Sequence, residues 1–391
     1  MVCIRNQFGV HQELPHENDE QYIQTKQAID KSIEYMKRLW KHTPNNNRIN
    51  YKCRNMHELC SFWSVDECGD DDPNRKYMHY QCAPACQTCH LLDSQLRCPI
   101  KEGNESVFKP GDLNTLMENI VDNADGSGDY LKYNPIALSR PKIKLDGSVA
   151  PGVEKDGPWV VLLENFISDK EADALVAAGY KKGYERSSDV GAENPDGTHE
   201  EDVSEGRTSE NAWCDVDLCE KDPIIAPVVE RIAAATNTNI YNSEHLQLLR
   251  YEPGQYYKQH HDYIEYQQDL PCGVRMLTLF LYLNEVEAGG GTRFPLLDIT
   301  VQPKKGNAVL WPSVLDANPE AKDARTDHEA LPVIKGIKYG VSCCLHTLLY
   351  IAISYLCSSN SPLMFNPNRQ MLGYIHEIIE RPKRMIVHSG R

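Results

Sequence analysis

Three side chains of this sequence could hold one metal ion. His260 and Asp262 lie two positions apart, and His328 follows much later in the chain. In an extended segment, residues two apart point to the same side, whereas the residue between them, here His261, points to the other. Two imidazoles and one carboxylate on one face of an iron(II) ion leave its opposite face open for a co-substrate and for dioxygen. The spacing therefore predicts an iron site for oxidation chemistry, with its third ligand supplied by a distant strand.

The His-x-Asp pair alone is weak evidence. In a chain with 14 histidines, such a triplet is expected roughly once by chance. The surrounding elements make the pattern more specific. Apolar, strand-like runs occupy residues 275–283 and 307–311, and a Gly-Gly-Gly-Thr turn lies between them at residues 289–292. Strands of this kind could carry a distant third ligand to the first two.

This region resembles the prolyl 4-hydroxylase family of 2-oxoglutarate-dependent dioxygenases. The resemblance covers residues 158–346 and includes both the His-x-Asp spacing and the ten-residue step from His328 to Lys338. It implies a mainly β protein with flanking helices, whose catalytic domain is a double-stranded β-helix, or jelly-roll. It also implies four catalytic residues: three ligands of Fe(2+), namely His260, Asp262 and His328, and a cation for 2-oxoglutarate, Lys338.

The implied role of Lys338 agrees with the chemistry of the co-substrate. 2-Oxoglutarate would chelate iron through its 2-oxo group and the adjacent carboxylate, so its far carboxylate would be buried and would need a fixed cation. Tyr257 and Thr278 match family positions that line the 2-oxoglutarate pocket, where hydroxyls could donate to the same carboxylate. The alternatives are ordinary strand packing for Tyr257 and Thr278, and an exposed strand face for Lys338.

Upstream, the Arg-Thr-Ser segment that begins at Arg207 matches a family segment near the peptide-binding groove. Arg207 is therefore a candidate substrate contact. It follows an acidic stretch, residues 189–206. This stretch is either a solvent-exposed series of charged residues or a mobile loop that becomes ordered over a bound peptide. One position departs from the family: Cys344 stands where a Trp is common, although His346 fits. Part of the substrate-side wall is expected to differ accordingly.

A cluster of six cysteines lies within residues 53–89, a window with too few aliphatic residues to form a core. Cross-links must replace that core, but spacing alone does not fix their pairing. A zinc module or a redox pair at Cys86 and Cys89 would leave the other four cysteines unexplained. The cluster closely resembles the ShK toxin-like (ShKT) domain, and this resemblance implies three disulfides: Cys53 with Cys89, Cys60 with Cys82, and Cys68 with Cys86.

Disulfides persist in oxidising compartments, so this module places the chain in the secretory pathway, either in the lumen of the endoplasmic reticulum or outside the cell. A compatible glycosylation sequon begins at Asn104. Residues 1–15 lack the apolar run of a clear signal peptide, and we expect no membrane span because no apolar stretch reaches about 18 residues. The states of eight further cysteines stay open: Cys3, Cys98, Cys214, Cys219, Cys272, Cys343, Cys344 and Cys357.

A chain of 391 residues should contain more than one unit. We expect an N-terminal segment with an amphipathic helix near residues 19–41. The catalytic unit should open with a strand at residues 158–164, followed by a helix capped by Ser168 with Glu171 and ending at Gly179. In order, the expected parts are residues 1–50 (N-terminal segment), 51–92 (ShKT-like module), 93–157 (linker), 158–346 (dioxygenase domain) and 347–391 (unassigned tail).

The resemblance implies a dioxygenase of the procollagen-proline 4-dioxygenase type. It would use Fe(2+), O2 and 2-oxoglutarate to hydroxylate peptidyl proline, releasing succinate and CO2, with L-ascorbate restoring oxidised iron. Its partner would be a proline-containing peptide or protein, which the cysteine module could recruit. The net charge of −15 argues against nucleic acid as a partner. The alternative is a secreted ShKT-containing interaction protein whose jelly-roll has lost turnover, as Cys344 and the tail could suggest. The sequence leaves the oligomeric state open.

Overall fold

The computed structural model describes residues 2–5, 11–14, 20–42, 53–69, 72–93, 106–193, 199–214, 218–219, 221–270 and 272–348. The expectations for Asn104, Cys98 and residues 349–391 lie outside this part of the chain. The described residues form two compact units that divide near residue 98. Within them, no helix combines the length and the apolar character that crossing a membrane requires.

The first unit combines a long helix with the cysteine-rich module. Helix α1 (Glu20–His42) covers the range expected for the amphipathic helix. Met36 of α1 is fully buried in a core shared with Tyr80, Leu91 and Leu92 of the module. The helix is therefore part of the module's core. The other elements are short: β1 (Val2–Arg5), β2 (His11–Leu14), α3 (Cys60–Trp63), α4 (Arg75–Gln81), α5 (Ala83–Cys86) and η1 (Cys89–Leu92).

Three disulfides cross-link this module, and they join Cys53 to Cys89, Cys60 to Cys82 and Cys68 to Cys86. This is the pairing that the ShKT resemblance implies. A fourth disulfide, Cys214–Cys219, lies in the second unit and closes a short loop whose state the sequence left open. Three other described cysteines are free and buried: Cys272, Cys343 and Cys344.

We expect peptide mapping, without reduction, of protein expressed through a secretory pathway to recover these four bridges and no stoichiometric zinc. The physical reason is that each bridged pair already has its Cα atoms 5.2–5.5 Å apart, within the range that a disulfide spans. Alkylation after denaturation should label Cys272, Cys343 and Cys344 without any reductant. Free thiols at Cys53, Cys60 or Cys68 would contradict both the pairing and an oxidising compartment.

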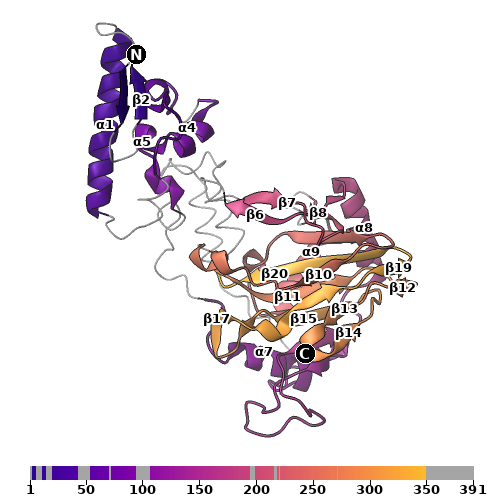
Figure 1. Ribbon diagram of the computed structural model, residues 1–391. Helices are drawn as coiled ribbons and strands as arrows, with labels where there is room; N and C mark the ends of the chain where they lie inside the picture. The colour runs from indigo at the N-terminus through magenta and orange to yellow at the C-terminus, as the bar shows by residue number, and fades with distance from the viewer. Residues whose placement is uncertain are drawn as a thin grey trace. The chain divides into compact units, whose positions relative to one another are not determined.

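The second unit is a double-stranded β-helix with helices on one face (Figure 1). In its large sheet, β11, β15 and β20 lie side by side. The strands in spatial order are β3 (Ile136–Ser139), β4 (Val160–Leu163), β15 (Ala308–Pro312), β11 (Arg275–Tyr282), β20 (Lys338–His346), β9 (Leu246–Tyr251), β8 (Glu210–Cys214) and β5 (Glu185–Arg186). The smaller sheet contains β10 (Tyr257–His260), β18 (His328–Ala330), β13 (Thr292–Phe294) and β14 (Ile299–Val301).

Alternation along β11 builds the two cores of this unit. Leu277, Leu279 and Leu281 pack in the core that includes the helices, whereas Phe280 and Tyr282 pack in the core shared with the small sheet. A strand buried on both faces reads as an almost continuous apolar run, as residues 275–283 do. The covering helices are α7 (Asp112–Asp122), α8 (Asp169–Lys182) and α9 (Ala226–Ala235).

Two-stranded sheets and short 3-10 helices complete the unit. Two-stranded pairs are β6 (Asp189–Glu193) with β7 (His199–Asp202), β12 (Ala288–Gly289) with β19 (Val333–Lys335), and β16 (Val314–Leu315) with β17 (Asn318–Lys322). Short 3-10 helices are η2 (Leu131–Tyr133), η4 (Ile240–Asn242), η5 (Glu265–Asp269), η6 (Pro295–Leu297) and η7 (Ala324–Thr326).

Much of the expected linker, residues 93–157, belongs to the catalytic unit instead. Strand β3 pairs with β4 in the large sheet, and Leu113, Met117 and Ile120 of α7 are buried in its core. Burial contributes roughly 1.5–3 kcal/mol per large apolar side chain, which stabilises a helix too short to persist alone. The glycines and aspartates of this stretch lie largely in the turns around these elements.

Helix α8 begins as expected and ends later. Ser168 and Glu171 form a reciprocal capping box at its start. The predicted end at Gly179 is wrong, because the helix continues to Lys182. A Cβ at residue 179 would collide with the ring and hydroxyl oxygen of Tyr184. Gly179 therefore permits close packing inside the helix rather than terminating it.

Candidate metal centre and active site

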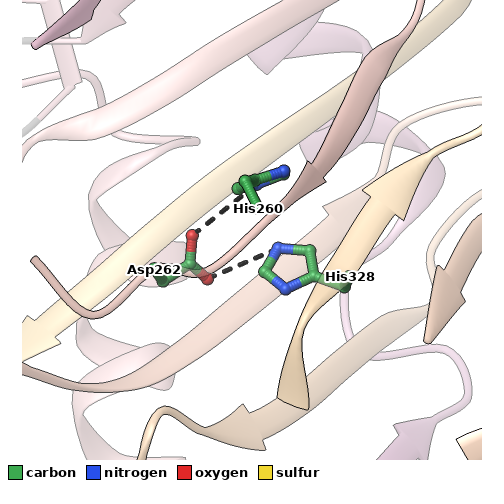
Figure 2. A group of neighbouring side chains, drawn as sticks. All are labelled: His260, Asp262 and His328. Atoms are coloured by element: carbon green, nitrogen blue, oxygen red, sulfur yellow. Dashed lines mark ion pairs between the residues drawn. The ribbon is translucent and has the colours of Figure 1, made fainter. Parts of the chain in front are cut away.

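The structure brings the three predicted metal ligands together. His260 ends β10 and pairs directly with His328, the first residue of β18. Asp262 follows two residues after His260. Its carboxylate faces both imidazoles (Figure 2), with Oδ1 4.0 Å from Nε2 of His260 and Oδ2 3.6 Å from Nε2 of His328. One ligand atom from each residue lies within 4.8 Å of the others, which is the spacing of a metal site.

Backbone carbonyls orient both imidazoles. Nδ1 of His260 lies 2.8 Å from the carbonyl oxygen of Lys258, and Nδ1 of His328 lies 3.0 Å from that of Thr326. A carbonyl only accepts, so each Nδ1 carries the proton and each Nε2 presents its lone pair to the site. Thr278 donates from its hydroxyl to Oδ2 of Asp262 at 2.6 Å. Such outer contacts fix the orientation of metal ligands.

Burial and charge keep His260 and Asp262 in metal-binding protonation states. Burial lowers the pKa of His260, and the neighbouring His328 lowers it further. Burial alone would raise the pKa of Asp262, but His328, His260 and the Thr278 hydroxyl together lower it below its ordinary value. A neutral imidazole and an ionised carboxylate are the forms that bind a cation.

Lys338 lies in the same cavity, which has a volume of about 310 Å³. Its side chain is completely buried, and its Nζ has no hydrogen-bond partner among the described residues. Three rings surround it, with Nζ 5.2 Å from the ring centres of Tyr251 and Phe280 and 5.7 Å from that of Tyr282. Burial lowers the pKa of Lys338 to about 7. An unpaired buried cation of this kind needs an anionic partner.

These observations fit an iron ion and a dicarboxylate co-substrate. The two imidazoles and one carboxylate form the facial donor set that suits non-haem Fe(II). The orphaned Nζ of Lys338 lines the same cavity as the three ligands and could pair with a distal carboxylate.

In this structure the hydroxyls of Tyr257 and Thr278 donate to carboxylates. Tyr257 donates to Oδ1 of Asp189 at 3.0 Å, and its ring stacks on His260 with centres 3.6 Å apart. Thr278 donates to Asp262, as described above. Both side chains therefore contact predicted metal ligands in this structure.

Arg207 also lines the cavity, where other groups hold its guanidinium. It donates to the carbonyl oxygen of Ser188 at 3.3 Å and to Oε1 of Gln247 at 3.1 Å, and it lies over the ring of Tyr257 at 4.7 Å. Asp189 lies 3.8 Å from the same guanidinium. Arg207 thus connects the base of the acidic β6–β7 hairpin to the ring that stacks on His260.

Three even-numbered residues of β20 line the cavity, whereas odd-numbered Val341, Cys343 and Leu345 lie in the core. Lys338, Ser342 and Cys344 face the cavity. Cys344 also lies 3.8 Å from the hydroxyl of Thr278. Burial raises the pKa of its thiol to about 12, so the thiol is neutral at physiological pH. The departure from the family at this position therefore gives the wall a small, uncharged side chain.

Sequence reasoning missed the aromatic cage and a charged pair in the wall. Tyr251 pairs directly with Lys338 across β9 and β20, and Phe280 and Tyr282 follow Thr278 at alternate positions on β11. Because alternate residues of a strand face the same side, Phe280 and Tyr282 could have been identified from Thr278 on the same strand. Arg275 binds Glu244 through two hydrogen bonds of 2.7 and 2.9 Å. The sequence gives no signal for that long-range pair.

Comparison with known proteins identifies the family. The 2OG-Fe(II) oxygenase superfamily matches residues 246–346. Prolyl 4-hydroxylase 1 of Arabidopsis thaliana is 32% identical over 211 residues, covering 50% of this chain and 71% of the relative. Prolyl 4-hydroxylase 2 of the same plant is 34% identical over 239 residues, covering 55% and 76%. The chain belongs to the prolyl 4-hydroxylase family. It is a 2-oxoglutarate- and Fe(2+)-dependent dioxygenase.

Relatives of this prolyl 4-hydroxylase family member include longer proteins. Prolyl 4-hydroxylase subunit alpha-2 of Caenorhabditis elegans is 32% identical over 218 residues, which cover 54% of this chain and 37% of that protein. Among solved structures, the viral collagen prolyl hydroxylase of Paramecium bursaria Chlorella virus-1 with 2OG is 29% identical, with a TM-score of 0.39. That match covers 49% of this chain and 98% of the viral one.

Proposed function

We propose that this dioxygenase hydroxylates peptidyl proline and converts 2-oxoglutarate and O2 to succinate and CO2. One oxygen atom enters succinate and the other becomes the hydroxyl of the product. The observation that carries the proposal is the buried Nζ of Lys338, which has no partner in the described part of the chain and lies in the cavity of the His260, Asp262 and His328 cluster. The relatives named prolyl 4-hydroxylases support proline as the substrate. Because all three metal ligands are present, the site does not favour the alternative of an interaction protein that has lost catalytic activity.

Each side chain has a defined part in this proposal. His260, Asp262 and His328 hold Fe(2+), and Lys338 binds the distal carboxylate of 2-oxoglutarate. The bound iron would supply the redox chemistry that couples decarboxylation to hydroxylation. Thr278 fixes the carboxylate of Asp262, and Tyr257 supports the ring of His260. L-Ascorbate would keep the iron reduced.

The experiment that tests this function measures succinate release from 2-oxoglutarate with a panel of proline-rich peptides. Each peptide is paired with a copy in which alanine replaces proline. We expect succinate release to require proline, and mass spectrometry to locate one added oxygen on that residue. Release that no proline peptide stimulates, or oxygen found on another residue, would reject peptidyl proline as the substrate.

Trp213 is a candidate for contacting the peptide, together with Arg207. It lies on β8, lines the cavity and is 42% exposed. An exposed indole at the edge of a cavity offers a flat apolar face, the kind of surface on which proline-rich peptides dock.

We expect Trp213→Ala to raise the KM for a proline peptide about tenfold with a smaller change in kcat, since a well-placed aromatic contact contributes roughly 0.5–1.5 kcal/mol beyond its burial. Trp213→Phe should retain most of the affinity because it keeps a flat ring. Steady-state kinetics with varied peptide provide the measurement. A KM unchanged in Trp213→Ala would remove this side chain from the substrate site.

The remaining expectations concern compartment and domain organisation. The four disulfides support folding in an oxidising compartment, such as the lumen of the endoplasmic reticulum, or secretion from the cell. Residues 51–92 would act as an ShKT-like module that recruits peptide, and the dioxygenase domain would extend through residue 346. Deleting the module should weaken use of long protein substrates more than use of short peptides.

A further inference from the structure

His261 lies between two of the proposed iron ligands, and its side chain connects the two parts of the chain that carry the ligand set. We propose that His261 is a positioning residue that holds the His260–Asp262 segment and the loop before His328 in one fixed relation. The inference rests on the iron site of the proposed function. Specifically, we infer that iron affinity depends on this tether, a part-buried side chain whose own atoms do not bind the metal.

Both nitrogens of His261 are engaged away from the ligand cluster. Nδ1 accepts the backbone N–H of Tyr263 at 2.9 Å. Nε2 therefore carries the proton, and it lies 2.9 Å from the carbonyl oxygen of Asp323 and 3.1 Å from the hydroxyl oxygen of Thr326. Because neither nitrogen is available, His261 cannot act as a fourth ligand.

Several hydrogen bonds hold the loop that His261 reaches. The carboxylate of Asp323 accepts from the backbone N–H of Arg325 at 3.1 Å and from its guanidinium at 2.7 and 2.8 Å. The backbone N–H of Asp323 donates to the carbonyl oxygen of Ser313 at 3.0 Å, and the Thr326 hydroxyl donates to the carbonyl oxygen of Asp323. These contacts make η7 an anchor that is itself attached to the body of the unit.

The anchor leads directly to the third ligand. The carbonyl oxygen of Thr326 receives Nδ1–H of His328 at 3.0 Å. A shift of Thr326 therefore turns the imidazole of His328, while a shift of His261 moves its sequence neighbours His260 and Asp262. The tether thus acts on all three ligands through two short paths.

A second bond between the same segments provides a matched control. Nε2 of Gln259 donates to Oδ2 of Asp327 at 3.1 Å, but this contact is exposed. An exposed hydrogen bond competes with water and contributes little. The contacts of His261 are part-buried, so breaking them leaves Asp323 and Thr326 with less access to replacement water. The Gln259 bond and the His261 bond join the same two segments, but only the Gln259 bond is exposed.

The test uses the full chain without metal and measures Co(II) binding by its visible absorption, with no turnover involved. We expect His261→Phe to weaken Co(II) affinity roughly 10- to 100-fold and to change the absorption bands, as losses of outer ligand contacts do. His261→Gln should recover most of the affinity, because its amide nitrogen can replace Nε2. Gln259→Ala should stay within about threefold of the parent protein.

Two further variants keep the result interpretable. His261→Asn is polar but too short to reach η7, so it should lose affinity as His261→Phe does, even if the phenylalanine variant fails to fold. Thr326→Val should weaken binding less than additively when combined with His261→Asn, because both break one tether. Parent-like Co(II) affinity and spectra in a folded His261→Asn protein would overturn the proposal, as would equal losses in Gln259→Ala.

Discussion

Replacing any one of His260, Asp262 or His328 with alanine is expected to abolish 2-oxoglutarate turnover while the fold survives. Each change removes one of three protein ligands, and the loss in metal affinity should exceed the roughly 10- to 100-fold that an outer hydrogen-bond partner contributes. The fold should survive because the cores of the unit are built from apolar side chains of β11, β15 and the helices. The measurements are bound iron, succinate release and thermal unfolding.

Among the ligand variants, Asp262→Asn removes the negative charge of the side chain but keeps its shape. Its amide oxygen can still accept from Thr278, so packing changes little, but the negative charge is lost. We expect this variant to bind iron weakly and to be inactive, whereas Gln259→Ala next to the site should remain active. Near-normal decarboxylation with full iron occupancy in any of the ligand variants would show that the ligand assignment is wrong.

Replacing Lys338 is expected to separate co-substrate binding from metal binding. Lys338→Ala leaves the far carboxylate of 2-oxoglutarate buried without a cation, which costs about 3–5 kcal/mol. That loss corresponds to an affinity on the order of 100-fold to several thousand-fold weaker. Lys338→Arg should also bind poorly, since three rings enclose the ammonium and leave a planar guanidinium no matching space.

Affinity for 2-oxoglutarate at fixed metal concentration provides the measurement, and metal affinity itself is the control. Metal binding should hardly change, because Lys338 is not among the three ligands. An unchanged 2-oxoglutarate affinity in Lys338→Ala would mean that another cation binds the carboxylate and that the assignment of this strand is incorrect.

The same lysine predicts a pH dependence. Burial holds its pKa at about 7 in the ligand-free protein, and a bound carboxylate raises it. Below pH 7 the ammonium is already charged, so affinity is constant. Above pH 7 binding must take up a proton, so affinity falls about tenfold per pH unit until the pKa of the complex is reached. Lys338→Ala should lack this slope.

The sequence predicted the parts of the site that depend on backbone periodicity. His260 and Asp262 meet in one ligand cluster, as their spacing predicts, although β10 ends at His260 and Asp262 lies in a bend. His261 between them is hydrogen-bonded to Asp323 and Thr326 instead. Lys338 faces the cavity from a regular strand. The disulfide partners also agree with the pairing implied by resemblance.

The sequence did not predict contacts that depend on side-chain direction over long separations. The partners of Tyr257 and Thr278 are carboxylates, Asp189 and Asp262, and the sequence does not specify which acceptor a hydroxyl finds. The contact of His261 with η7 spans more than 60 residues. The linker was misjudged because turn residues outnumber the apolar positions of α7, although those positions decide where it packs.

Residues of β20 alternate between the cavity and the core, and this alternation limits which mutations the strand can tolerate. Lys338, Ser342 and Cys344 face the cavity, while Val341, Cys343 and Leu345 lie in the core. Losing or gaining one codon within this strand would exchange the two sets, placing aliphatic side chains in the cavity and polar ones in the core. Substitutions such as the cysteine at position 344 can accumulate there, but single-residue insertions and deletions between Lys338 and His346 should be absent from active relatives.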